Sequence, residues 1–373
     1  MMGRAIGTGL GLLFGAALLV GCAGRHSTEP IPVGVLAPRT GPDKLHGESA
    51  WQGAVLAQAE VDGNNLIHSR HVLLQQGDTG AGPEAAQAVA GRLVQVDNVV
   101  ALLADFGVHH GDRLGSVAEE GRVPLILPAE LPGPSNKNVF HTAAAPVERG
   151  RALARFALEQ KARRALVLTF VEAGKTEPSG VNAALTEGFK EAFKTEGLTV
   201  HAYTKRAELP ELVRSNKSAD VLVLVGPSAD LGALPTGKSD SKRLHIWAGP
   251  EGGVQTLHDH AELPPVYLAT SFWFDPAAAP VKDFMARYHD KFKQTPDVFA
   301  TVGYDDARLL FEALRRAERL EPEKIQTALA GLSDFPSLTG PVSIREGWAR
   351  RTVFVLRVVQ GKAALVKAYP SEP

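Results

Sequence analysis

Cysteine is almost missing from this chain of 373 residues, because Cys22 is its only thiol. A single cysteine excludes an intramolecular disulfide framework and any metal site built from several thiolates. The fold must therefore be held together by buried apolar side chains. Apolar residues make up 44% of the sequence, which is enough to build cores of ordinary size.

The sequence also lacks a concentration of charge of one sign. Its formal net charge is −1, and no run of five like charges occurs along the chain. Proteins that bind nucleic acids present a basic surface, and this composition does not supply one. We therefore expect no nucleic-acid partner.

Motifs of the common catalytic sites are the third absence. The sequence contains no Gly-x-Ser-x-Gly elbow and no His-Glu-x-x-His zinc motif. The glycine-bearing stretches Gly174–Gly180 and Gly226–Gly237 lack the strand-to-helix spacing of a phosphate loop. We therefore predict a binding protein rather than an enzyme, without a cofactor or a metal centre.

The N-terminal segment has the pattern of a secretory signal. Arg4 is followed by a mostly apolar run from Ala5 to Val20, which is shorter than the ~20 residues of a transmembrane helix. The run ends in Leu19-Val20-Gly21-Cys22, which resembles the lipobox of bacterial lipoproteins, where the cysteine is acylated. We expect a signal peptide over 1–21, lipidation of Cys22, a tether over 22–30 and an envelope or periplasmic location. An ordinary signal peptide with an incidental cysteine is the alternative.

Short apolar runs alternate with helical patterns along most of the chain. This alternation predicts parallel sheets covered by helices on both faces. The predicted strands are Pro32–Ala37, His71–Gln75, Val99–Leu103, Val123–Leu127, Ala165–Phe170, Leu198–Tyr203, Val221–Val225, His245–Ala248 and Val266–Ala269. The predicted helices between them include Glu48–Val61, Pro83–Val94 and Val181–Lys194.

The C-terminal part has a different pattern. Apolar residues recur at helical spacing from Val281 to Phe292 and again from Phe299 to Ala317, which predicts two amphipathic helices with buried faces. A strand over Arg351–Val359 is followed by Gln360-Gly361-Lys362, where we expect a hairpin turn.

Several segments together resemble the leucine/isoleucine/valine-binding family of type I periplasmic binding proteins, the solute receptors of ABC importers. The segments that carry the resemblance are Ile31–Gly41, Gly47–Ala57, Asp78, Ala118–Pro124, Gly249–Gly252, Gly303–Arg308 and Phe335–Pro341. The resemblance implies an α/β fold of two doubly wound parallel-sheet lobes joined by three crossing segments. Closure of the two lobes around a small-molecule ligand would signal occupancy to an ABC permease.

The resemblance also implies where the chain passes between the lobes. The crossings are expected near Val139–Pro146, Val266–Phe274 and Leu338–Pro341. Lobe 1 would then hold residues 31–141 and 269–338. Lobe 2 would hold residues 142–268 and 339–373, including the C-terminal strands.

Two residues of the implied pocket fit a ligand that carries an amine and an apolar part. Glu251 stands at the family's acidic partner of the ligand ammonium, where a carboxylate accepts charge-assisted hydrogen bonds. Phe299 stands at an aromatic that packs on the ligand. An ordinary loop glutamate and a plain core phenylalanine are the alternative interpretations.

The carboxylate side of the implied pocket departs from the family pattern. Its two clamp hydroxyls fall at Val108, within Gly107-Val108-His109, and at Leu131, within Ala129-Glu130-Leu131. Neither side chain can donate a hydrogen bond. His46 replaces the aromatic of the first pocket loop. His46, His109 and His110 could supply donors to an anion when protonated, and no metal is expected because nothing holds three ligands at fixed spacing.

The altered clamp leaves the biological role open. The sequence favours a substrate-binding lipoprotein for an amino-acid-like or related organic solute. An outer-membrane lipoprotein that activates a peptidoglycan synthase is the first alternative, and a sensor of amides is the second. The segments Gly249–Gly252 and Gly303–Arg308 argue for the importer branch.

Overall fold

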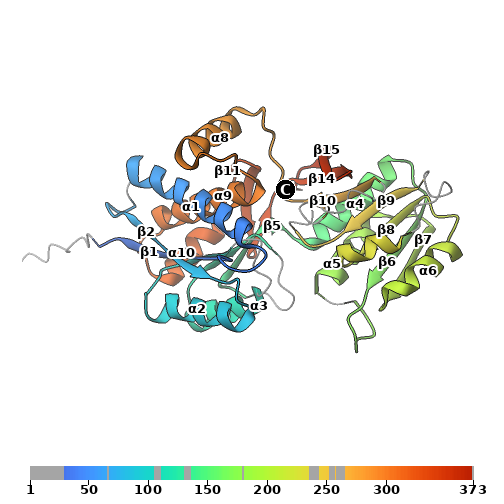
Figure 1. Cartoon of the computed structure of the whole chain (residues 1–373), viewed down its shortest axis with the longest axis horizontal. Helices are drawn as coiled ribbons and strands as arrows, with labels where there is room; N and C mark the ends of the chain where they lie inside the picture. The colour runs from blue at the N-terminus through green and yellow to red at the C-terminus, as the bar shows by residue number, and fades with distance from the viewer. Residues whose placement is uncertain are drawn as a thin grey trace, which may run out of the picture.

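Two separate β-sheets, each covered by helices on both faces, divide the chain into two lobes that lie side by side along its long axis (Figure 1). This computed structural model describes residues 29–64, 67–104, 111–129, 136–178, 180–234, 243–251, 257 and 265–371. The bilobed α/β architecture confirms the fold class expected from the sequence.

Lobe 1 is built on an eight-stranded sheet. Its strand order is β11 (Phe335–Ser337), β12 (Gly340–Arg345), β13 (Trp348–Arg350), β5 (Val139–Ala144), β4 (Leu125–Leu127), β3 (Leu102–Ala104), β1 (Ile31–Ala37) and β2 (Val72–Asp78). One face carries α1 (Lys44–Asn64), α8 (Ala279–Phe292), α9 (Val298–Arg316) and α10 (Pro322–Ala330). The other face carries α2 (Pro83–Gln95) and α3 (Gly111–Glu120).

Helices α1 and α9 approach each other closely because glycine lies at both contact points. A Cβ at Gly53 would lie 2.1 Å from the carbonyl oxygen of Ala300, and one at Gly303 would lie 2.2 Å from that of Ala50. Real Cβ atoms do not approach other atoms this closely, so the two glycines set the spacing of the helices. This contact places residues of α1 and α9, which are far apart in the sequence, together beside β1 and β3.

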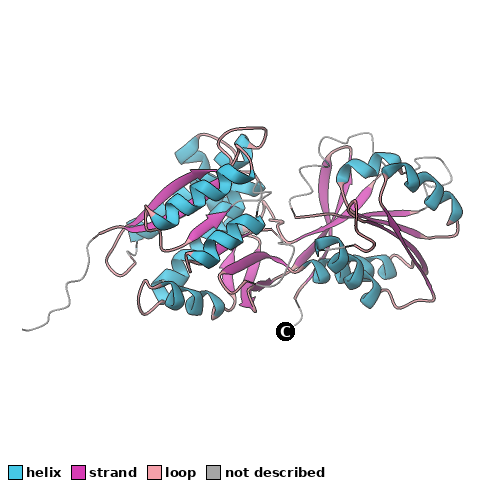
Figure 2. Ribbon diagram, turned by 90° about the horizontal axis from the view of Figure 1, so that it is seen from below, coloured by secondary structure: helices cyan, strands magenta, loops and turns pink. Residues whose placement is uncertain are grey.

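Lobe 2 is built on a seven-stranded sheet. Its strand order is β15 (Lys362–Tyr369), β14 (Val353–Val359), β10 (Val266–Thr270), β9 (Leu244–Ala248), β8 (Val221–Val225), β6 (Arg164–Phe170) and β7 (Gly197–Tyr203). One face carries α4 (Pro146–Glu159) and α5 (Gly180–Ala192). The other face carries α6 (Leu209–Ser215) and the 3-10 helices η1 (Arg206–Glu208) and η2 (Ser228–Ala233). Figure 2 shows helices on both sides of the strands in each lobe.

Both sheets are mixed rather than purely parallel, because each one ends in antiparallel hairpins. The β12–β13 loop is Glu346-Gly347, with φ of 52° and 78°, and the β14–β15 loop is Gln360-Gly361, with φ of 49° and 73°. Positive φ at both loop residues is the type I′ turn that matches strand twist. The hairpin predicted at Gln360-Gly361 is confirmed, whereas the first one was not predicted.

The first of these hairpins moves the third crossing between the lobes. Strand β12 pairs with β13, and β13 pairs in parallel with β5, so the chain stays in the lobe 1 sheet up to Arg350. The chain therefore crosses at residues 351–352 and not at Leu338–Pro341. Residues 339–350, assigned to lobe 2 from the sequence, lie in lobe 1. Residues 142–144, at the end of β5, also lie in lobe 1 instead of lobe 2, whereas residues 269–270, at the end of β10, lie in lobe 2 instead of lobe 1. The other passages are at residue 145 and at residues 271–278, between β5 and α4 and between β10 and α8.

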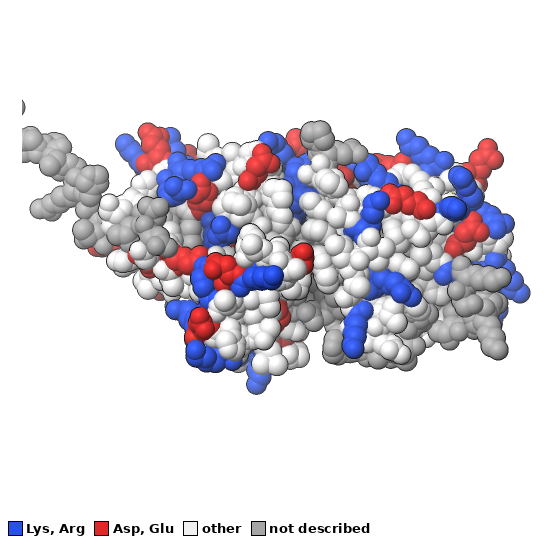
Figure 3. Space-filling model, turned by 90° about the horizontal axis from the view of Figure 1, so that it is seen from above, with Lys and Arg blue, Asp and Glu red and all other residues white. Residues whose placement is uncertain are grey.

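The surface shows no large patch of one charge on the face drawn in Figure 3, where basic and acidic side chains are interspersed. Within the described part of the chain, no helix has the length and apolar character needed to cross a membrane.

Helix α1 begins at Lys44, four residues earlier than predicted, so its first turn includes His46.

Candidate functional site

A small pocket lies at the carboxyl ends of the lobe 1 strands. The space that it encloses is about 20 Å³, and it is lined by β1, β3, α1 and α9. Its lining is mostly apolar and includes Val35, Ala50, Ala54, Leu103, Phe299 and Asp306. Loops at this end of parallel strands are where ligands bind in open α/β sheets. This pocket is the candidate ligand site.

Of the residues nominated from the sequence, Phe299 lines this pocket, and His46 stacks on Phe299 without lining the pocket itself. The rings of His46 and Phe299 stack with their centroids 4.1 Å apart and their planes 13° apart. Phe299 is only 4% exposed, whereas the His46 side chain is 38% exposed and its Nδ1 lies 3.6 Å from the Asp43 carboxylate. Phe299 thus presents a buried apolar surface, and His46 presents a polar ring nearer to solvent.

The loop after β1 is held by Asp78, the last residue of β2. Its carboxylate accepts hydrogen bonds from the Arg39 amide at 2.8 Å, the Thr40 hydroxyl at 2.9 Å and the Gly80 amide at 2.9 Å. Burial favours the protonated acid, but these donors outweigh it and lower the pKa of Asp78. The charged carboxylate therefore shapes the loop that leads to His46.

The three crossing segments are joined by polar contacts between the lobes. The Ser271 hydroxyl accepts a 2.8 Å hydrogen bond from the Ala144 amide, which links the first two crossings. Arg351, in the third crossing, donates at 2.7 Å to the Thr142 carbonyl and also donates to the Thr339 hydroxyl. Its guanidinium lies 4.5 Å from the centroid of the Phe272 ring. We call this region, formed by residues 142–145, 271–272 and 351 with their partners, the hinge.

Glu251 belongs to this hinge. Its side chain is completely buried and accepts hydrogen bonds from the Thr270 hydroxyl at 2.9 Å, the Ser271 amide at 2.9 Å and the Ser271 hydroxyl. The guanidinium of Arg149, which is itself 1% exposed, lies 3.4 Å away and donates at 2.9 Å to the Gly249 carbonyl. The charge of Glu251 is thus balanced within the protein. Its role as a ligand contact stays a prediction.

Two further carboxylates lie buried beside the hinge on α9. Asp306 accepts a 3.0 Å hydrogen bond from the Thr142 hydroxyl, and Asp305 accepts the Leu338 amide at 2.9 and 3.0 Å. Burial raises the pKa of Asp306 to about 8 and that of Asp305 to about 6, against the opposing effect of these donors and of Arg351. The family segment Gly303–Arg308 therefore contributes to the hinge as well as to the pocket.

The partners of these carboxylates were not predicted from the sequence. Arg149 could have been recognised from its spacing, because it lies on the same face of α4 as Leu153 and Phe156, and all three side chains are buried. A charged residue on a buried stripe requires a partner of opposite charge. No comparable pattern marks Thr142, Ser271 or Arg351 before the crossings are known.

Most of the predicted carboxylate clamp lies outside the described residues. This applies to Gly107, Val108, His109, Glu130 and Leu131, and also to the lipidation site Cys22. Ala129 is described, and its carbonyl accepts a 2.7 Å hydrogen bond from Nδ1 of His141. Burial lowers the pKa of His141 to about 4, so its ring is neutral. The ring stacks on that of Trp348 with the two centroids 3.8 Å apart.

Two chemical alternatives can be checked against the structure. Residues 232–239 have the letters of a phosphate loop, Gly-x-x-x-x-Gly-Lys-Ser, but strand β8 ends at Val225 and Gly232 lies within the 3-10 helix η2. A phosphate loop instead begins directly after its strand. In the portion of the chain that the structure covers, no three His, Cys, Asp or Glu side chains gather as metal ligands.

Comparison with known proteins places this architecture among solute receptors. The family model described as periplasmic binding protein matches residues 30–364. A Leu/Ile/Val-binding protein homolog of Brucella abortus is 23% identical over 341 residues, covering 85% of this chain and 84% of the relative. An amino acid binding protein of Pseudomonas aeruginosa is 29% identical over 103 residues, which span only 28% of each chain.

Solved structures agree with this fold. A substrate-binding protein of an ABC transporter from Desulfitobacterium hafniense, in complex with Leu, matches with a TM-score of 0.73 at 18% identity, covering 91% of this chain and all of that one. A solute-binding protein from R. palustris, in complex with benzoate, matches with a TM-score of 0.64 at 18% identity, covering 92% and 97%. At these identities the likeness concerns the fold.

Proposed function

Because this chain belongs to the leucine/isoleucine/valine-binding family of type I periplasmic binding proteins, we propose that it is the substrate-binding component of an ABC importer. It captures a small organic solute by closing its two lobes and performs no chemistry on it. The observation that carries this proposal is the apolar pocket at the carboxyl ends of the lobe 1 strands, beside three crossings between the lobes.

The pocket supports a solute with an apolar part. Its lining by valine, alanine and leucine side chains favours a hydrocarbon or aromatic group against Phe299, with the polar end of the solute directed toward His46. An amino-acid-like solute with its amine toward Glu251 is the first candidate. A related organic acid without an amine is the second, and it is favoured by the balance of Glu251 with Arg149 inside the protein.

A thermal-shift screen of the mature protein tests the proposal and separates these classes, since a ligand that binds only the folded state raises its apparent stability. The screen compares branched-chain amino acids, benzoate-type acids and amides. Small-angle scattering with the best ligand then measures whether the radius of gyration decreases on binding. A panel without any stabilising solute, together with a cell-wall gene neighbourhood, would favour the peptidoglycan-synthase activator.

Phe299→Leu is expected to weaken binding of the solute identified in the screen by about threefold to tenfold. Leucine keeps the site apolar but removes the flat ring, and an aromatic contact contributes about 0.5–1.5 kcal/mol beyond its buried area. Calorimetric titration measures the change. The matched control is Phe193→Leu, which removes a buried ring stacked on Phe189 in lobe 2. Equal affinities of the Phe299 and Phe193 variants would remove Phe299 from the site.

We further propose that Cys22 carries the lipid anchor of the mature protein. Cys22→Ser is expected to abolish incorporation of labelled palmitate and to move the protein from the membrane fraction to the soluble fraction, because a serine cannot form the thioether to the lipid. Labelling of cells that express either form, followed by fractionation, measures both effects. Labelling that persists in the serine variant would place the acylation elsewhere.

A further inference from the structure

Asp306 is an acidic side chain in the otherwise apolar lining of the candidate ligand site. It lies seven residues after Phe299 on α9, so both residues lie on one face of the helix, about two turns apart. The side chain of Asp306 is only 5% exposed. Among the described residues that line the pocket, it is the only one that can ionise. The other lining residues are Val35, Ala50, Ala54, Leu103, Ala104, Phe299, Val302 and Gly303.

The carboxyl group of Asp306 is bonded within the protein through one of its oxygens. Its Oδ2 accepts the 3.0 Å hydrogen bond from the Thr142 hydroxyl. Within the residues that the structure describes, no donor bonds to Oδ1. The neighbouring Asp305 differs, because both of its oxygens lie at hydrogen-bond distance from the Leu338 amide. Asp306 therefore keeps an acceptor atom for a ligand.

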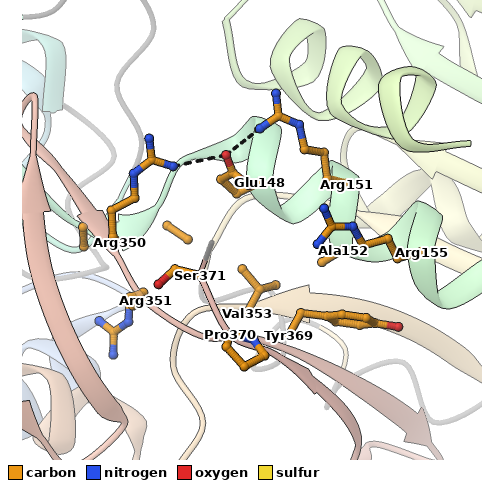
Figure 4. Close-up of a pocket in the computed structure, with 12 residues that line it drawn as sticks. Glu148, Arg151, Ala152, Arg155, Arg350, Arg351, Val353, Tyr369, Pro370 and Ser371 are labelled. Atoms are coloured by element: carbon orange, nitrogen blue, oxygen red, sulfur yellow. Dashed lines mark hydrogen bonds and ion pairs between the residues drawn. The ribbon is translucent and has the colours of Figure 1, made fainter. Parts of the chain in front are cut away.

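Two charged groups act on Asp306 from the elements around it. Arg351 of the third crossing favours the ionised carboxylate, whereas Asp305 on the same helix opposes it. Figure 4 shows the guanidinium of Arg351 turned away from Arg350 and from the arginines of α4, and it donates to the Thr142 carbonyl at the hinge. Helix α1 and strands β1 and β3 contribute only apolar side chains to the pocket lining. Burial outweighs the cation, so Asp306 is mostly protonated at pH 7 in the ligand-free protein.

The space beside Asp306 has the size of one small group. It encloses about 20 Å³, which is enough for roughly one water-sized group. An anionic head group would need several donors, and the apolar lining does not supply them. A primary ammonium brings three donors of its own and forms charge-assisted hydrogen bonds with a carboxylate. A cation is also attracted to an aromatic face such as that of Phe299.

We propose that Asp306 determines the specificity of this site by selecting a solute that carries a primary ammonium group. The proposal rests on the proposed function, and it assigns to Asp306 the role that the family resemblance implied for Glu251, whose charge is balanced by Arg149. The ammonium donates to Oδ1, and the apolar body of the solute extends toward Phe299. As the ammonium binds, the carboxyl group releases its proton to the solvent, so a charged pair replaces the neutral acid.

Leucine, isoamylamine and isocaproate are the probes, because they share a branched hydrocarbon and differ in their head groups. Calorimetric titration in buffers of different ionisation enthalpy counts the protons released on binding. With a pKa of about 8 for Asp306, isoamylamine should release about 0.9 proton at pH 7 and about 0.1 at pH 9. Its affinity should be about tenfold higher at pH 9, where no proton has to be displaced. Isocaproate, which lacks the amine, should bind at least about tenfold more weakly than leucine.

Asp306→Asn keeps an acceptor for Thr142 but cannot ionise. It should weaken the binding of both amines by about tenfold or more, abolish proton release and leave the affinity for isocaproate unchanged. Asp283→Asn is the matched control, since Asp283 is exposed on α8, and it should keep the wild-type affinities and proton count. A purely structural role of Asp306 would instead weaken all three ligands equally.

The proposal is overturned if neither amine binds, if an amine binds without releasing a proton at pH 7, or if Asp306→Asn weakens all three ligands equally. The proton count of the wild type decides the question even if the Asp306 variant does not fold. Stabilisation by organic acids alone in the solute screen would overturn this proposal and leave the proposed function standing. A screen in which no organic solute stabilises the protein would overturn both.

Discussion

Replacing Glu251 with alanine is expected to lower the free energy of unfolding by about 3–5 kcal/mol. The reason is that Arg149 is 1% exposed and would keep its positive charge in the interior without its carboxylate partner. The donors of Thr270 and Ser271 would lose their acceptor as well. Urea unfolding of the ligand-free protein, followed by circular dichroism, measures this change.

The double variant Arg149→Met with Glu251→Leu distinguishes a broken ion pair from a simple loss of packing. Removing both charges removes the unpaired buried cation, so its stability should recover to within about 2 kcal/mol of the wild type. Glu211→Ala is the control, because Glu211 forms an exposed pair with Arg214, and no measurable change is expected. A double variant as unstable as Glu251→Ala would contradict the charge explanation.

The same variant separates two roles of Glu251. If it acts at the hinge, Glu251→Ala destabilises the protein without any ligand. If it meets a ligand amine instead, the unfolding curve stays unchanged while the affinity for amino acids falls. Measuring stability and affinity on one preparation therefore decides between the role seen in the structure and the role predicted from the sequence.

The second large effect concerns pH. Asp306 has an ordinary pKa of 3.8 when unfolded and about 8 when folded, because burial disfavours its charged form. Between these values the folded state binds more protons than the unfolded state, so stability decreases as pH rises and levels off above about 8. From pH 6.5 to 8 the wild type should lose about 1–2 kcal/mol.

This window isolates Asp306 from its neighbours. Asp305 has a pKa of about 6, and its own contribution falls mainly below the window. His141 has a pKa lowered by burial from 6.5 to about 4, so it stabilises the fold above 6.5 and loses that contribution only as pH falls. Neither group dominates from pH 6.5 to 8.

Asp306→Asn should flatten the dependence of stability on pH in this range, because asparagine keeps an acceptor for Thr142 and does not titrate. Urea unfolding at four pH values measures the slope. Asp283→Asn is the control, since Asp283 is 67% exposed on α8, and it should keep the wild-type slope. A wild-type protein whose stability does not change over this range would show that Asp306 is ionised in the fold.

Local patterns in the sequence predicted most of the strands. Strand β8 was predicted with its observed bounds, Val221–Val225, and β10 was placed within one residue. Runs of this kind are buried on both faces of a parallel sheet, so their composition alone identifies them. The turn at Gln360-Gly361 was also recognisable from the sequence, because the positive φ of a two-residue hairpin loop is a local requirement that glycine satisfies.

Pairings between distant segments were not predictable in this way. Strand β13 is three residues long, and its place beside β5 depends on contacts that no local pattern contains. For that reason the third crossing was placed about ten residues too early. The pair of Arg149 with Glu251 spans about a hundred residues and forms only because α4 packs against β9 in lobe 2.

The amino-acid sequence by itself predicted the alternation of strands and helices, a signal segment before Cys22, and His46 and Phe299 as candidate pocket residues. Each of these depends on side-chain type and spacing along the chain. Only the tertiary structure decided that His46 stacks on Phe299, that Glu251 is neutralised by Arg149, and that Asp306 lines the pocket beside the hinge. These features depend on burial and on distances between segments, which arise when the two lobes fold and meet at the hinge.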